Sequence, residues 1–384
     1  MRLPDLDNAL ALLDKICRHA PASIPPVEND AGGVILYGAG NLGKLAFDFL
    51  QHVGVRVKYA LDRAASPQMY LAPGVKIYPP HDAPRHETGL ILVTTVSAPF
   101  TTIKRDLTRL GFKQILPFYD YAQHHAARHP LNNGWFTGSI SAEDQAGMAS
   151  VLRSLVEPQS RAAYLQFLAW RILRQDWVFD AAPVKPDDRY FIKPVTDSLT
   201  NCEDYVDVGA YDGRVFVRLL EITRNQFASA LLIEPDAENL QMLNATLKDI
   251  SVEARLKITV SPLAIADCKG RIPFSHGFNM TSRVCEATSQ FTDCIRLDDL
   301  DAPVSFLKLH IEGGEYDALR GGMNMLQRHR PMLVATLYHN RNGLWKTISW
   351  LTSHIEGYDF LLRVHSWCGT GFVMYALPQE RSPH

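Results

Sequence analysis

Two histidines and a carboxylate stand where two strand-like segments of the sequence end. His310 and Glu312 close the run VSFLKLHIE, and His339 closes PMLVATLYH. In open α/β sheets ligands gather beyond the carboxyl ends of the strands, so we expect these side chains beside a reacting group. An imidazole with a pKa of about 6.5 can remove a hydroxyl proton. His310 is therefore the candidate general base, with His339 as the alternative base and Glu312 beside them.

The same three residues also permit two other interpretations. His310 could instead be a core histidine whose hydrogen bonds position the loop that follows the strand. Two imidazoles and the Glu312 carboxylate would also be an acceptable set of ligands for a metal ion. Spacing within a single sequence does not decide between these roles, so the need for a metal stays open.

A glycine-containing loop, VDVGAYDGRV at residues 206–215, follows another strand-like segment. The next strand ends at Glu234, where an α/β nucleotide site holds two ribose hydroxyls, because each carboxylate oxygen can accept one hydrogen bond. The loop is short and acidic, which suits a cationic cofactor without phosphate. S-adenosylmethionine (SAM) fits that description. With Glu234, the candidate cofactor-binding residues are those of the loop: Asp207, Gly209, Asp212 and Gly213.

A second glycine loop lies earlier in the chain and has the pattern G-x-G-x-x-G. It follows the strand-like VILY, opens a helical segment and contains Gly38, Gly40 and Gly43. Such glycines allow a pyrophosphate to approach a helix N-terminus, and Asp62 stands where a ribose-binding carboxylate is expected. The alternatives are a nucleotide-sugar site, or a turn that is kept for packing and binds no nucleotide.

Composition excludes several classes of protein. The chain has 384 residues with 39 Lys and Arg against 41 Asp and Glu, a formal charge of −2, and 46% of its residues are hydrophobic. A nearly neutral chain without a clustered basic face is not expected to bind nucleic acid. We find no uncharged apolar stretch long enough to span a membrane and no secretory signal in the first residues. The six cysteines show no metal-like spacing, and we expect them to be reduced in a cytoplasmic protein.

Strand-like and helix-like segments alternate in two separate parts of the sequence, which predicts two doubly wound α/β domains with parallel sheets. We expect an N-terminal helix and a small Rossmann-like domain in residues 1–126. A linker and two bridging helices should occupy residues 127–200, and a larger α/β domain residues 201–384. The sequence does not indicate an oligomeric state.

The larger domain resembles FkbM-type methyltransferases. The resemblance rests on VDVGAYDG, LIEPDAENL, PLAIADCKGRIPF, IRLDDL, FLKLHIEGGEYDALRGG and PMLVATLYH, in the order seen in that family, and covers about residues 150–377. It implies a class I methyltransferase fold, a seven-stranded sheet with a terminal antiparallel hairpin, and SAM-dependent methylation of hydroxyl groups on sugars, glycoconjugates or polyketide-type products. The loop at residues 38–43 resembles an accessory Rossmann-like domain that some members carry.

The resemblance also bears on Asp267 and His310. Asp267 stands where class I enzymes bind the adenine amino group, so the resemblance implies an adenine-binding role. His310 occupies the position at which the family pattern K-x-D-x-E-G-A-E usually has aspartate. The departure puts in doubt a carboxylate base or an oxygen-only metal site at that position.

The sequence is compatible with three functions. The leading one is a SAM-dependent O-methyltransferase that acts on a small-molecule or glycan acceptor. The second is a non-catalytic module that binds a nucleotide-sugar or a cofactor, in which His310 marks lost chemistry. The third is an NAD-dependent oxidoreductase built on Gly38–Gly43, although the first half contains no Tyr-x-x-x-Lys pair for hydride chemistry.

Overall fold

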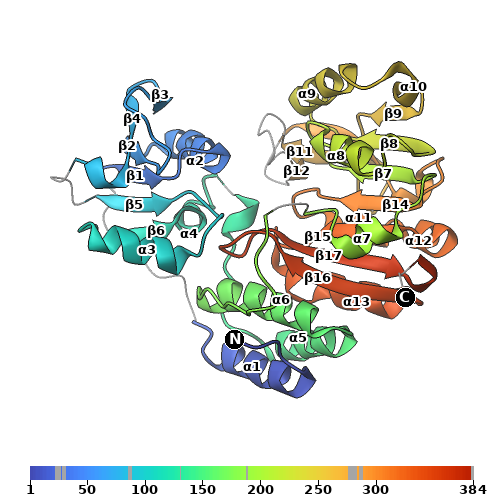
Figure 1. Cartoon of the computed structure of the whole chain (residues 1–384), viewed down its shortest axis with the longest axis horizontal. Helices are drawn as coiled ribbons and strands as arrows, with labels where there is room; N and C mark the ends of the chain where they lie inside the picture. The colour runs from blue at the N-terminus through green and yellow to red at the C-terminus, as the bar shows by residue number, and fades with distance from the viewer. Residues whose placement is uncertain are drawn as a thin grey trace.

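The computed structural model of the chain describes residues 1–21, 27, 32–84, 89–129, 131–186, 189–275, 283–284 and 289–381. The chain forms two α/β units that lie side by side, and a group of helices lies below them in the view of Figure 1. Within the described residues, no helix has both the length and the apolar character needed to cross a bilayer.

The first sheet has six strands in the order β3-β4-β2-β1-β5-β6. All neighbours pair in parallel except β3, which is antiparallel to β4. Its strands form because short apolar runs are buried on both faces, as a parallel sheet covered by helices requires. The strands are β1 (Val34–Tyr37), β2 (Val57–Leu61), β3 (Tyr70–Ala72), β4 (Val75–Tyr78), β5 (Leu90–Val93) and β6 (Ile115–Pro117), and the helices are α2 (Asn41–His52), α3 (Phe100–Arg109) and α4 (Phe118–His124).

The second sheet has seven strands in the order β16-β17-β15-β14-β7-β8-β9. Strand β17 is antiparallel to both of its neighbours, and the other pairs are parallel, so the predicted sheet with its terminal hairpin is confirmed. The strands are β7 (Asp204–Val208), β8 (Ser229–Ile233), β9 (Ile258–Ser261), β14 (Phe306–Leu309), β15 (Met332–Thr336), β16 (Tyr358–Val364) and β17 (Phe372–Pro378).

Helices cover both faces of this seven-stranded sheet. Alternate residues of a strand point to opposite faces, so Leu307 and Leu309 join one apolar core while Phe306 joins the other. Local signals set where these helices begin; Asp236, for example, caps α9 by accepting from two backbone N–H groups. The helices are α7 (Lys193–Ser198), α8 (Arg214–Ile222), α9 (Ala237–Lys248), α10 (Val252–Arg255), α11 (Glu315–Arg320), α12 (Met323–His329) and α13 (Lys346–His354).

A small four-stranded sheet, which the sequence analysis did not anticipate, interrupts the second α/β alternation. Its order is β10-β13-β11-β12. The strands are β10 (Ala264–Ile265), β11 (Gly270–Ser275), β12 (Arg283–Val284) and β13 (Phe291–Ile295). Two of them have only two residues, too short for a periodic pattern to reveal.

The N-terminal helix α1 (Leu6–Arg18) requires a correction, because it does not pack on the first sheet with which the sequence grouped it. Its buried residues Ala9, Leu13 and Ile16 join the core of the second half. There the helix contacts the two bridging helices, α5 (Ala142–Ser154) and α6 (Pro158–Leu168). Figure 1 shows α1 beneath α5 and α6.

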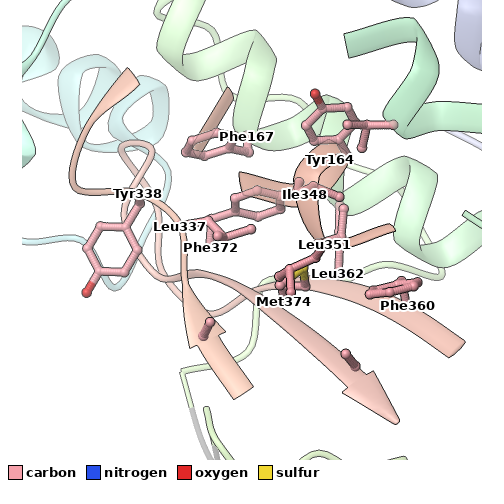
Figure 2. Packing of buried hydrophobic residues seen from close by; sticks show 14 of the residues in the cluster. Tyr164, Phe167, Leu337, Tyr338, Ile348, Leu351, Phe360, Leu362, Phe372 and Met374 are labelled. Atoms are coloured by element: carbon pink, nitrogen blue, oxygen red, sulfur yellow. The ribbon is translucent and has the colours of Figure 1, made fainter. Parts of the chain in front are cut away.

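Helix α6 connects this group of helices to the second sheet. It begins with Pro158 in its first turn, where a missing N–H breaks no helical bond. Phe167 on α6 stacks on Phe372 of β17 with 4.2 Å between ring centroids. Figure 2 shows these rings with Leu362 and Met374 in the same apolar core. The bridging helices thus belong structurally to the methyltransferase-like half.

Candidate active site

A cavity of about 500 Å³ lies at the carboxyl ends of β7, β8 and β14. This volume is within the range of about 300–1,000 Å³ that is usual for small-molecule sites. Its wall includes residues from both halves of the chain and from the small sheet. Those residues include Asn41, Leu42, Val96, Tyr119, Asn133, Arg189, Tyr190, Gly209, Asp212, Glu234, Leu263, Ala264, Phe274, Lys308, His310, Glu312 and Tyr338.

Gly209 lines the cavity at a position where no residue with a side chain fits. Its φ is +78°, and a Cβ atom built on it would lie 2.0 Å from the carbonyl oxygen of His310. The loop after β7 therefore passes directly against the end of β14. Gly213 has a similar φ of +79°, but its added Cβ would meet Leu243, and Gly213 does not line the cavity. Gly213 is thus required by packing, while Gly209 and Asp212 face the site.

Glu234 stands at the tip of β8 and faces the cavity, as predicted for a ribose-binding carboxylate. Its oxygens accept hydrogen bonds from the backbone N–H of Tyr211 at 2.9 Å and of Asp236 at 3.0 Å, and from the Asn239 side chain at 3.2 Å. Burial raises the pKa of this carboxyl. These bonds fix the carboxylate beside the glycine loop.

Asp207 does not belong to the cavity wall, which corrects its prediction as a cofactor-binding residue. Its side chain is fully buried and lies 2.7 Å from the Lys308 ammonium, and the Tyr205 hydroxyl donates to it at 3.0 Å. Although burial opposes it, the Asp207 carboxylate raises the pKa of Lys308. Lys308 Nζ also donates to the Gly209 carbonyl at 2.6 Å. Asp207 therefore acts through Lys308 to hold the glycine loop.

Asp267 also lies outside the cavity. Its side chain is 42% exposed, and its carboxylate is 3.7 Å from Arg320 on α11. The chain reaches the cavity a few residues earlier, at Leu263 and Ala264. The structure thus gives no support to an adenine contact by Asp267, because the turn after β10 carries its side chain toward α11 instead.

The three candidate catalytic residues lie together at the ends of β14 and β15. His310 Nε2 is 3.2 Å from one oxygen of Glu312, and His339 Nδ1 is 3.2 Å from the other. Glu312 therefore sits between two imidazoles whose ring centroids are 5.1 Å apart. Within the part of the chain that the structure describes, their donor atoms lie within 4.8 Å of one another and could hold a metal ion.

Electrostatics distinguish the members of this cluster. Burial lowers the pKa of His310 to about 3, although Glu312 favours the charged imidazole. Burial alone would raise the pKa of Glu312, but His339 and His310 outweigh it and hold that pKa well below its usual range. Burial thus favours the neutral form of the His310 imidazole, and its two neighbours favour the ionised form of Glu312.

Two tyrosines, which the sequence analysis missed, contact His310. The hydroxyl of Tyr190 lies 2.6 Å from Nδ1, and that of Tyr338 lies 3.3 Å from Nε2. The direction of the bond to Tyr190 depends on the tautomer of His310, because Nδ1–H donates to the tyrosine oxygen whereas a bare Nδ1 accepts from the hydroxyl. No motif or spacing marks either tyrosine in the sequence. They come to His310 only through tertiary structure.

Glu315 holds the loop that carries Glu312. Its carboxylate accepts from the backbone N–H of Ile311 at 3.0 Å and of Gly313 at 2.9 Å, and from the hydroxyl of Thr336 at 2.8 Å. Between those two N–H groups, Glu312 adopts a φ of +54°, in the left-handed region that non-glycine residues seldom occupy. Glu315 is therefore a positioning residue for the Glu312 carboxylate.

The first glycine loop has the predicted strand–turn–helix context, and two of its glycines, Gly38 and Gly43, are required by close packing. Gly38 has a φ of +111°, and a Cβ on Gly43 would lie 2.2 Å from the Gly38 carbonyl oxygen. Gly40 is the N-cap of α2. Asp62 accepts from the backbone N–H of Ala39 at 2.8 Å and of Ala64 at 2.9 Å. None of these four predicted residues lines the large cavity.

The neighbours of that loop do reach the cavity. Asn41 and Leu42, in the first turn of α2, line it together with Val96. The first half therefore contributes part of the cavity wall.

Sheet order, glycine loop and strand-end carboxylate together define a doubly wound α/β domain with a cavity at its carboxyl edge. The family model described as the methyltransferase FkbM domain matches residues 207–362. This part of the chain is thus similar to FkbM methyltransferases, as the sequence predicted. No curated protein matches the chain.

Solved structures include one with the same fold along nearly the whole chain. This is a methyltransferase FkbM from Methylobacillus flagellatus KT, with 20% identity over 96% of this chain and 98% of that chain, and a TM-score of 0.63. A putative methyltransferase from Thermoplasma acidophilum has 13% identity over 47% of this chain and 70% of that one, with a TM-score of 0.31. The two-sheet arrangement is thus shared with the Methylobacillus protein.

Proposed function

We propose that the protein is a SAM-dependent O-methyltransferase whose acceptor is a hydroxyl group of a sugar, glycoconjugate or polyketide-type molecule. The observation that carries the proposal is the Glu234 carboxylate, fixed beside the Gly209 loop in a cavity that continues to His310 and Glu312. A nucleoside site and a cluster able to act on a hydroxyl thus share one chamber. The FkbM family match supports methyl transfer as the reaction.

The residues that line the cavity suit the ribose, the adenine and the amino acid end of SAM in one particular arrangement. The Glu234 oxygens can accept the two ribose hydroxyls. Adenine would then lie beside Leu263 and Ala264, under Phe274 of the small sheet, where the surroundings are apolar. The amino acid end would lie along the loop after β7, near Asp212. This order directs the sulfonium methyl toward His310.

The reaction needs little covalent participation by the protein. A lone pair of the acceptor oxygen forms a bond to the methyl carbon, the carbon–sulfur bond breaks, and its electron pair stays on sulfur as the neutral thioether. The hydroxyl proton must leave the acceptor oxygen. The groups that can assist its loss are those of the His310, Glu312 and His339 cluster, while the cavity walls orient the two reactants.

Acceptor binding is the role that we assign to the first half. Leu42 at the start of α2 lines the cavity. If the first half binds the acceptor, truncation of Leu42 should weaken acceptor binding and leave SAM binding unchanged. We expect Leu42→Ala to raise the acceptor KM. The matched control is Lys44→Ala, an exposed position on the same helix that does not line the cavity. Equal KM values for the two variants would contradict this role.

Equilibrium dialysis of the purified chain against radiolabelled SAM, and separately against radiolabelled NAD, tests the proposed cofactor. We expect saturable binding of SAM at one site per chain and no saturable binding of NAD. Binding of NAD alone would favour the oxidoreductase alternative. Binding of SAM without methyl transfer to any member of a panel of sugars, glycoconjugates and polyketides would favour a binding module.

A further inference from the structure

His339 has no hydrogen-bond partner among the described residues for either ring nitrogen, although its side chain is only 1% exposed. A neutral imidazole carries one N–H donor and one acceptor, and leaving such groups unsatisfied in the interior of a protein is unfavourable. Its Nδ1 faces Glu312 Oε2 at 3.2 Å without hydrogen-bond geometry, and Oε2 is likewise unsatisfied. Buried polar atoms that face each other without a hydrogen bond indicate a site for a bound group.

The spacing of the donors suits a metal ion. Metal–nitrogen and metal–oxygen bonds of about 2.0–2.2 Å place tetrahedral ligand atoms about 3.3–3.6 Å apart. His310 Nε2 lies 3.2 Å from Oε1 of Glu312 and His339 Nδ1 lies 3.2 Å from Oε2, so each imidazole is already at nearly this distance from one oxygen of the carboxylate. All three donors lie within 4.8 Å of one another. Small side-chain adjustments would therefore bring them onto one ion.

Charge and outer contacts favour a cation at the same point. Histidine binds a metal ion through a neutral imidazole, so as a set of metal ligands the three side chains carry the single negative charge of the carboxylate, which attracts a cation. The nearby Lys308 ammonium is already paired with Asp207 at 2.7 Å. Tyr190 lies 2.6 Å from Nδ1 of His310 and can fix the tautomer that directs Nε2 inward, as outer partners of metal-bound histidines do.

We propose that His310, Glu312 and His339 bind one divalent transition-metal ion at the end of the cavity. Imidazole ligands select such an ion over magnesium and calcium, which prefer oxygen ligands. Three protein ligands leave a coordination position free, and His310 and Glu312 line the cavity on that side. His339, which does not line the cavity, is the ligand behind them.

If the proposed function holds, the free position gives the ion a role in methyl transfer. The acceptor hydroxyl oxygen would bind there, and the ion would lower its pKa so that the proton passes to solvent water before the oxygen attacks the methyl carbon.

The test is metal binding to the purified, tag-free full chain after treatment with a chelator. Titration with CoCl2 is followed by visible d–d absorption, and titration with ZnCl2 by calorimetry. We expect one ion per chain, with absorption typical of a low-coordinate site with nitrogen ligands. Tyr190→Phe should weaken binding by about 10–100-fold, and His310→Ala or His339→Asn should weaken it further. His354→Ala, on an exposed helix position, is the control and should bind as the wild type does.

The same samples are titrated with SAM, which shows that each variant is folded and separates this inference from the proposed function. Stoichiometric SAM binding without metal binding would overturn the metal site and leave the methyltransferase proposal in place. Metal binding that is unaffected in both His310→Ala and His339→Asn would also overturn it, because the ion would then lie elsewhere. Metal binding without SAM binding would support the site and contradict the proposed cofactor.

Discussion

Glu234 accepts a hydrogen bond of 2.9 Å from the backbone N–H of Tyr211, which ties the tip of β8 to the glycine loop after β7. The first half repeats the arrangement, since Asp62 at the end of β2 accepts from Ala39 N–H at 2.8 Å. In both halves an acid at a strand end fixes the preceding glycine loop. The two sites differ in what lies in front of them, because Glu234 faces the large cavity and Asp62 does not.

Substituting Lys308 by methionine should destabilise the protein, because it leaves the Asp207 carboxylate buried without its ion-pair partner. Breaking a buried pair in this way typically costs about 3–5 kcal/mol. SAM affinity should fall as well, since Lys308 no longer holds the Gly209 carbonyl. Urea denaturation and calorimetry measure the two effects.

The double variant Asp207→Asn, Lys308→Met is the control for that experiment. It removes both charges and should recover part of the lost stability without recovering SAM affinity. If Lys308→Met alone unfolded at the wild-type urea concentration, the proposed link between the ion pair and the loop would be wrong.

A fragment that begins near residue 141 should be poorly soluble, because it lacks α1 and exposes the apolar surface that Ala9, Leu13 and Ile16 cover. A chain in which residues 27–126 are replaced by a flexible Gly/Ser linker retains α1. We expect this chain to fold and bind SAM. Circular dichroism and calorimetry compare the two, with Leu13→Asp in the linked chain as the control. A soluble, SAM-binding fragment 141–384 would show that α1 is dispensable.

The two sheets could be predicted because their strands are apolar runs separated by helical periodicity, which are local properties of the sequence. The place of α1 could not be predicted in the same way. Its apolar stripe shows that the helix needs a partner, but nothing in that stripe says which sheet provides it. The short strands β10 and β12 carry too few residues for any pattern.

In the candidate site, too, the residues that could be predicted are those whose positions follow from local sequence. Gly209, Asp212, Glu234, His310 and Glu312 reach the cavity because each follows directly from the end of a strand. Asp207 was misassigned because its partner comes from another strand. Lys308 stands opposite it in the register of β7 and β14, a pairing that depends on residues about a hundred positions apart. Tyr190 and Tyr338 depend on tertiary contacts in the same way.

Glu203 should make stability depend on pH in the acid range. Although burial opposes ionisation, hydrogen bonds from Ser305 and Thr200 and the Arg381 guanidinium hold the pKa of Glu203 below the usual value for glutamate. A carboxyl with a depressed pKa contributes stability above its unfolded pKa and loses that contribution as the pH falls through the folded value. Wild type should therefore be more stable than Glu203→Gln at pH 7, by a margin that shrinks below about pH 4.5.

Unfolding by urea at several pH values measures this margin. The exposed Glu253→Gln, on α10, is the control and should follow the wild type at every pH. A margin between wild type and Glu203→Gln that stayed constant down to pH 3 would mean that the Glu203 carboxyl is not held ionised in the folded protein.

Replacing His310 by alanine should lower kcat for methyl transfer to a hydroxyl acceptor by about 10²–10⁴-fold, the usual contribution of assisted proton removal. SAM affinity should stay nearly unchanged, because His310 is not one of the groups that hold the Glu234 carboxylate. Transfer of a labelled methyl group measures kcat, and calorimetry measures SAM binding. Full activity in His310→Ala with loss of activity in His339→Ala would move the role to His339.

SAM affinity of Glu234→Gln, measured by calorimetry against the wild type, tests the central claim most directly. The amide can accept at only one of its two heavy atoms, so at least one ribose hydroxyl loses a charged acceptor at a buried site. We predict a loss of about 1–3 kcal/mol in binding free energy. The control Glu238→Gln, exposed on α9, should bind SAM as the wild type does. Equal SAM affinity in Glu234→Gln and the wild type would contradict the account.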